Sequence, residues 1–177
     1  MTIFLISILV LAFVFLKSRP ASANSDEICE TISDYLSEDN WKFNFDEDDK
    51  VFTFNLSIDG QLQHLGYMVF VRDDNYSVYA MAPIRADHED EEIMSRIAEF
   101  ICRANYGLRN GNFELDMSDG EIRYKVFVDC EDIIPSRHMI KNSILMSAAM
   151  FERYSPGFIK VMFKDANPEE AVEECES

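Results

Sequence analysis

The sequence lacks the short motifs that mark the common enzyme classes. It contains no G-x-S-x-G nucleophile elbow, no phosphate-binding loop, no dinucleotide fingerprint and no H-E-x-x-H zinc site. Its three histidines, His64, His88 and His138, are far apart in the chain. The sequence therefore predicts no catalytic residue, no cofactor and no metal ion. It favours a non-enzymatic protein over the alternative of an uncharacterised enzyme.

Positive charge is scarce. The 177 residues include 33 aspartates and glutamates but only 16 lysines and arginines, which gives a formal net charge of −17. Such a chain repels the phosphates of nucleic acids and the headgroups of anionic lipids, so we do not expect it to bind nucleic acid. Its acidic surface favours a basic protein or peptide as partner.

Cysteine pairs with the spacing of a metal site are also lacking. The four cysteines, Cys29, Cys102, Cys130 and Cys175, include no C-x-x-C pair. Their even number permits two disulfides if the domain is exported, so their redox state stays open. The acidic run 46–49 lacks the glycine and glutamate of a calcium loop, and we predict a solvated hairpin turn there.

One long hydrophobic run is present. Residues Met1–Leu16 are apolar apart from Thr2 and Ser7, and Lys17 and Arg19 follow. A helix of about 16 residues spans about 24 Å, against about 30 Å for the hydrocarbon core, so the run would form a short membrane anchor. Because the two cations follow the run, the positive-inside rule places the remaining chain in the cytoplasm.

A cleaved signal peptide is the alternative. Ala21-Ser22-Ala23 fits an A-x-A cleavage site, and cleavage near Ala23 would release an exported domain. However, no lysine or arginine precedes the apolar run, as one would in a typical signal peptide. Both alternatives divide the chain in the same way, into a hydrophobic segment (1–19), a linker (20–25) and one domain (26–177).

The periodicity of apolar residues predicts the elements of this domain. Predicted helices cover 26–37, about 88–106 and 136–154, and predicted strands cover 41–45, 51–58, 62–72, 76–81 and the two arms of a hairpin over 111–129. Ser155-Pro156-Gly157 is predicted to end the third helix, before a short apolar piece (158–163) and a last acidic helix from Asn167. The fold class is α+β, an antiparallel sheet packed by helices in the order α-β-β-β-β-α-β-β-α.

The hairpin over 111–129 carries regularly spaced charges. Asp119-Gly120 favours a two-residue type I′ turn, which would place Asp116 opposite Arg123 and Glu114 opposite Lys125. Each carboxylate would then have a cation as its neighbour. We predict that these charges are the solvated side of a sheet rather than a catalytic acid–base pair.

Two segments offer more apolar surface than a single core face needs. Strands 62–72 and 76–81 are apolar on both faces, so helices, a partner or a second copy should cover both. The helix over 136–154 is rich in methionine, which repacks easily. We predict that a protein or peptide partner, or a second copy of the chain, binds at Met139, Met146, Met150, Phe151, Phe70, Tyr79 and Met81.

The segment between the second predicted helix and the hairpin has a specific pattern. It reads Asn105-Tyr106-Gly107-Leu108, then Gly111-Asn112-Phe113-Glu114-Leu115-Asp116 and Asp119-Gly120-Glu121-Ile122-Arg123-Tyr124, with Arg153-Tyr154-Ser155-Pro156-Gly157 further on. This pattern resembles the YbjN-like bacterial family over roughly residues 27–174. The resemblance implies a fold similar to that of type III secretion chaperones, which usually dimerise and bind polypeptide segments. The family is often labelled a sensory transduction regulator, and the resemblance implies no catalytic residue.

The combined hypothesis is a non-enzymatic binding or regulatory module that is tethered to a membrane. It would recognise a polypeptide through an apolar sheet face and the methionine-rich helix. The acidic rim would select basic partners.

Overall fold

The computed structural model describes residues 25–177. The predicted anchor or signal segment and nearly all of the linker lie outside these residues. Within the described part, no helix combines the length and the apolar character that crossing a membrane requires.

The described residues form three helices and six strands in the predicted order, followed by the predicted fourth helix at the end. The elements are α2 (Ser25–Glu38), β1 (Phe43–Asp46), β2 (Val51–Ser57), β3 (His64–Val71), β4 (Asn75–Arg85), α3 (Glu91–Asn105), β5 (Asn112–Leu115), β6 (Glu121–Asp129), α4 (Arg137–Phe163) and α5 (Pro168–Glu176). The α+β fold class is therefore confirmed.

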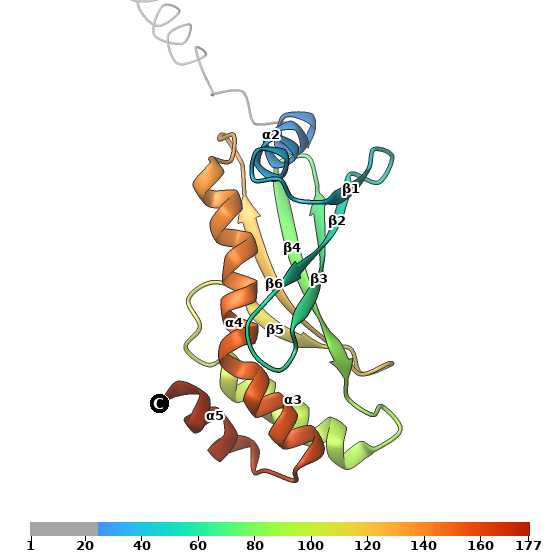
Figure 1. The fold of residues 1–177 in the computed structure, drawn as a ribbon, viewed down its shortest axis with the longest axis vertical. Helices are drawn as coiled ribbons and strands as arrows, with labels where there is room; N and C mark the ends of the chain where they lie inside the picture. Colours follow the sequence, from blue (N-terminus) through green and yellow to red (C-terminus); the bar gives the residue numbers. More distant parts are fainter. Residues whose placement is uncertain (1–24) are drawn as a thin grey trace, which may run out of the picture.

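The strands form one antiparallel sheet in the order β1-β2-β3-β4-β6-β5. Helix α4 runs along this sheet and packs against β4 and β6 (Figure 1). Helix α2 packs against α4, β3 and β4, whereas α3 and α5 lie together at the opposite end of the molecule (Figure 1). β1 and β5 are consequently the two edges of the sheet.

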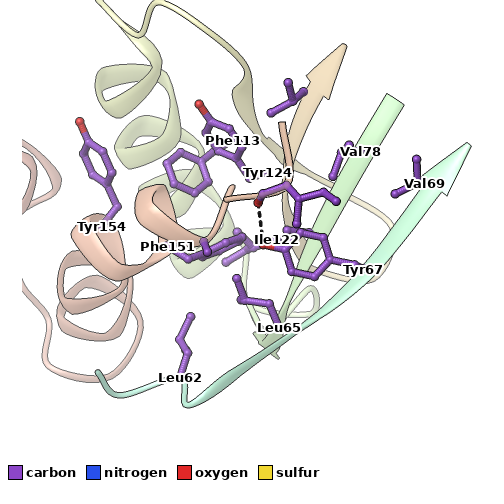
Figure 2. Packing of buried hydrophobic residues seen from close by; sticks show 14 of the residues in the cluster. Leu62, Leu65, Tyr67, Val69, Val78, Phe113, Ile122, Tyr124, Phe151 and Tyr154 are labelled. Atoms are coloured by element: carbon purple, nitrogen blue, oxygen red, sulfur yellow. Dashed lines mark hydrogen bonds between the residues drawn. The ribbon is translucent and has the colours of Figure 1, made fainter. Parts of the chain in front are cut away.

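The core lies between the helices and one face of the sheet, which we call the inner face. Tyr67, Val69, Val78 and Tyr124 point from this face toward the helices (Figure 2), and each is at most 1% exposed. The hydroxyl group of Tyr67 donates a hydrogen bond of 3.1 Å to the carbonyl of Ile144 in α4. This bond satisfies the polar end of a buried ring and ties the sheet to the long helix.

The register of the β5–β6 hairpin differs from the predicted one. Asp116 and Glu121 close a four-residue loop, because the N–H of Asp116 donates to the carbonyl of Glu121 (2.9 Å). Glu114 therefore pairs with Arg123, and Asp116 does not. The predicted two-residue turn is wrong, but the register shift is two residues, so every side chain keeps its predicted face.

Two contacts explain the longer loop, one within the loop and one with a distant segment of the chain. The side chain of Asp116 accepts hydrogen bonds from the N–H and the hydroxyl of Ser118, which fold the loop around the carboxylate. Gly120 ends the loop with a φ of 73°, and its carbonyl accepts from the N–H of Ala86 at 2.9 Å. A Cβ atom at Gly120 would lie 1.9 Å from the carbonyl oxygen of Ala86, so only glycine fits there.

The predicted break at residues 155–157 is also wrong. Helix α4 continues from Arg137 through Pro156 to Phe163. The apolar spacing continues as well, since Phe158 and Val161 are buried against the same core as Phe151. Tertiary packing of this second half outweighs the local cost of a proline inside a helix.

Candidate binding surface

The central strands have a second face, which points away from the helices. Along β3 from Leu65 onward and along β4 as far as Met81, buried and half-exposed side chains alternate strictly. The half-exposed set belongs to neither the core nor the hydrophobic residues packed around it. We call this face the outer face and define it by Val51, Thr53, Met68, Phe70, Tyr79, Met81, Arg123, Lys125 and Phe127. None of the described helices packs against it.

Strand register places the outer-face residues side by side. Met68 pairs with Tyr79, which pairs with Lys125 on the other side. In the next row, Phe70 and Phe127 flank Ser77. The rings of Phe70 and Tyr79 meet edge to face at 5.6 Å. Phe127 is 55% exposed, so this patch leaves a large aromatic ring open to water.

Cations lie over the aromatic rings of this patch. The guanidinium of Arg123 is 4.6 Å from the ring centroid of Tyr79, and the ammonium of Lys125 is 5.7 Å from it. Glu114 on β5 accepts from Arg123 at 2.7 Å and lies 3.8 Å from Lys125. Burial alone would lower the pKa of Arg123, but the hydrogen bond and charge of Glu114 outweigh it and raise that pKa. Glu114 thus holds Arg123 over the Tyr79 ring and favours its charged form.

Two shallow hollows extend the outer face toward β1. The larger, about 630 Å³, lies over Val51, Thr53, Met68 and Phe70, with Arg72 at its side. The second, about 510 Å³, lies between β1 and β4 and is lined by residues that include Lys42, Asn44, Gly66 and Met81. Both hollows are open to solvent, as expected of a surface that accepts side chains of another chain.

The predicted binding residues separate into two groups. Phe70, Tyr79 and Met81 lie together on the outer face. Met139, Met146, Met150 and Phe151 belong to α4, on the other side of the sheet. Met146 and Met150 pack against the core, and Phe151 is fully buried against Phe113 with ring centroids 5.3 Å apart. The two groups therefore lie on opposite sides of the sheet, and Phe151 is not exposed to a partner.

The remaining candidates form no shared site in the described part of the chain. Residues 25–177 contain no group of histidine, cysteine or acidic side chains arranged to hold a metal ion. Asp46 accepts the N–H groups of Asp48 and Asp49, which makes the acidic run a hairpin turn as predicted. The pKa of Asp116 is lowered by its hydrogen bonds from Ser118, so this carboxylate serves the loop.

All four cysteines have free thiols. Burial raises the pKa of Cys130 to about 11 and also raises the pKa of Cys29 and Cys175, whereas Cys102 is exposed. Raised pKa values keep these thiols protonated, and a protonated thiol is a poor nucleophile. The buried cysteines therefore serve packing.

Comparison with known families identifies the chain. Residues 29–160 match the family YbjN, described as "Putative bacterial sensory transduction regulator", and this is most of the chain. The chain belongs to the YbjN family. The match includes every outer-face residue and ends before α5. The family's description is that of a regulator and not of an enzyme. No match was found among curated proteins or among solved structures.

The predictions from the sequence did not include several residues of the outer face. Phe127, Arg123 and Lys125 lie on it because β6 pairs with β4, a strand that precedes it by about 40 residues. Alternation within β6 did group these three side chains on one face. What it could not predict is which strand they would lie beside, because strand order depends on contacts between distant segments.

Proposed function

We propose that this YbjN protein is a membrane-tethered, non-enzymatic binding module that recognises a polypeptide through the outer face of its sheet. The observation that carries the proposal is a half-exposed apolar patch on the central strands that no described helix covers. A sheet with apolar residues on both faces is normally covered on both. A partner would supply the missing cover.

The chemistry of the outer face suits a polypeptide. Met68 and Met81 are flexible and adapt to side chains of different shape. The rings of Phe70, Tyr79 and Phe127 offer large contact area, and aromatic residues dominate the energetics of many protein interfaces. The family's description as a regulator agrees with this function. The net charge of −17 would favour partners with basic surfaces around the contact.

Site-specific photo-crosslinking tests the proposal. A benzophenone amino acid replaces Phe127 on the outer face or, as a matched control, Leu145 on α4, which is 37% exposed. We expect a discrete protein adduct from position 127 of the full-length chain in cells that produce it natively, and none from position 145. The adduct should weaken when Met81→Ser is added. An adduct of twice the chain mass would identify a second copy as the occupant.

The opposite result is equally clear. No adduct at position 127, or the same adducts from both positions, would contradict binding at the outer face. An adduct that is insensitive to Met81→Ser would contradict it as well, because Met81 lies in the middle of the proposed contact.

The tether rests on the sequence of the N-terminal segment, with Lys17 and Arg19 after an apolar run. Membrane fractionation and intact mass test it together. Full-length mass in the membrane pellet would support an anchor with the domain in the cytoplasm. A chain that begins at Asn24 in a soluble exported fraction would instead support the signal peptide, and the tether would be wrong.

A further inference from the structure

The two edges of the sheet differ in the state of their backbone groups. At the β5 edge, Asn105 of α3 lies alongside Phe113. Its side-chain amide donates to the carbonyl of Phe113 at 2.9 Å, and its side-chain oxygen accepts the N–H of Phe113 at 2.8 Å. One side chain thus satisfies both backbone groups that a neighbouring strand would use. The β5 edge is closed at its central residue.

The β1 edge is open, as the hydrogen-bond alternation of antiparallel strands shows. The N–H of Val71 donates to the carbonyl of Lys50, so every second pair from there joins β2 to β3. The intervening β2 residues, Val51 and Thr53, therefore form their backbone hydrogen bonds with β1, where their partners are Asp46 and Asn44. The N–H and carbonyl groups of Phe43 and Phe45 point away from the sheet. No described residue bonds to them.

The surroundings of this open edge are apolar and negatively charged. A hollow of about 420 Å³ between α2 and β1 is lined by Cys29 and Phe45 and by the acidic side chains of Asp26, Glu30 and Glu47. Lys50, the single cation of this lining, is bound by Asp26 at 2.6 Å. The aromatic ring of Phe45, 36% exposed, stacks on Phe52 at 4.3 Å and forms the floor beside the edge.

We propose that β1 accepts an extended segment of a partner polypeptide as a seventh strand, and that this segment alternates apolar and basic residues. Phe43 and Phe45 offer two N–H and two carbonyl groups to such a strand. Because side chains alternate between the faces of a strand, its basic residues would enter the hollow, where their aliphatic stems would cover Phe45 and their cations would meet Glu30 and Glu47. Its apolar residues would then point to the opposite side and extend the outer face. The inference rests on the proposed function for its polypeptide partner, but it uses a different surface.

A direct test uses the full-length protein and a fluorescent eight-residue peptide of alternating valine and lysine, blocked at both ends. The first control peptide carries glutamate in place of lysine. The second is N-methylated at alternate residues, which removes the N–H groups on one side of the strand without changing the protein. Binding is followed by fluorescence anisotropy at low ionic strength. We expect both controls to bind at least about tenfold more weakly.

A protein variant complements these peptides. Phe45→Pro removes the outward N–H but leaves the β1–β2 hydrogen bonds, because residue 45 does not take part in them. Phe45→Ala is the matched control, since it removes the ring and keeps the N–H. We expect Phe45→Pro to bind the valine–lysine peptide about tenfold more weakly than Phe45→Ala. Circular dichroism confirms that both variants are folded.

The outcomes separate this proposal from the proposed function. Equal binding by Phe45→Pro and Phe45→Ala, equal binding of the methylated peptide, or no binding of the valine–lysine peptide by the wild type would overturn strand addition at β1. If Phe127→Ser weakens peptide binding while Phe45→Pro does not, the outer face binds the polypeptide and only the edge proposal is wrong.

Discussion

At the scale of single residues, Asn105 links the recognised sequence pattern to a physical task. It ends α3 and stands at the start of the stretch that resembles the YbjN-like family. Its side chain then occupies the place of a strand beside Phe113. Phe113 is 2% exposed, so without this amide its backbone N–H would lack a partner in a nearly dry environment. This residue of the pattern therefore serves the fold rather than chemistry.

Replacing this side chain should be costly. We expect Asn105→Ala to lower the free energy of unfolding by about 2–3 kcal/mol, because it leaves the buried N–H of Phe113 unpaired. Asn112→Ala is the control, since Asn112 donates only to the carbonyl of Phe113, at 3.2 Å, and Asn105 also serves that carbonyl. Asn112→Ala should cost less than about 1 kcal/mol. Urea unfolding measures both, and equal losses would contradict the role given to Asn105.

At the scale of elements, α4 holds the molecule together. It packs against β4 and β6 of the sheet and against all three other described helices, α2, α3 and α5. Pro156 lies about two turns before the C-terminal end of α4 and is exposed. The next residue, Gly157, is buried, and a Cβ atom there would lie 2.6 Å from the ring of Phe100. Pro156 and Gly157 both weaken a helix, but they differ in their surroundings. Close packing against Phe100 requires glycine at position 157, whereas position 156 faces solvent.

Substituting alanine at each of the two positions tests this difference. Pro156→Ala should raise the free energy of unfolding by about 1–3 kcal/mol, because the helix regains an N–H donor without a new clash. Gly157→Ala gains about 1 kcal/mol of helix propensity but overpacks Phe100, whose ring is fixed by Phe158 at 4.6 Å.

We expect a net loss of about 1–2 kcal/mol for Gly157→Ala. Thermal unfolding of the two variants is the measurement. A stabilised Gly157→Ala would mean that Phe100 can move aside and that the close contact is not needed.

At the scale of the whole molecule, the core contains many tyrosines. Burial raises the pKa of Tyr76, Tyr124 and Tyr154 to about 12, and burial raises the pKa of Tyr67 as well. A free tyrosine has a pKa of about 10. The folded state therefore favours the neutral rings. This contribution to stability is fully present below pH 10 and is lost as the pH rises toward 12.

The urea midpoint should consequently stay level up to about pH 9 and fall steeply between about pH 10 and 12. For Tyr76 alone the loss amounts to about 3 kcal/mol at the upper end. Tyr76→Phe also loses the hydrogen bond with Ser143, which lowers its stability at every pH. The quantity to compare with the wild type is therefore the slope of the urea midpoint against pH between about pH 10 and 12. A variant slope equal to that of the wild type over this range would contradict the assignment to Tyr76.

The sequence by itself determined the features that local periodicity controls. Alternation in β3, β4 and β6 predicted which side chains share a face, and helical spacing predicted α2, α3 and the first half of α4. Neighbouring residues set these patterns, because each side chain's direction follows from the backbone of its own element. The α+β order followed from the same signals, with β-hairpins between turn residues.

Tertiary structure decided the rest. It carried α4 through Pro156, because distant residues bury its second half, and it shifted the β5–β6 register through the contact of Gly120 with Ala86. It also placed all described helices on one face of the sheet, which separates Phe70, Tyr79 and Met81 from the methionines of α4. A sequence pattern can predict that a face is apolar, but what covers that face depends on packing between segments far apart in the chain.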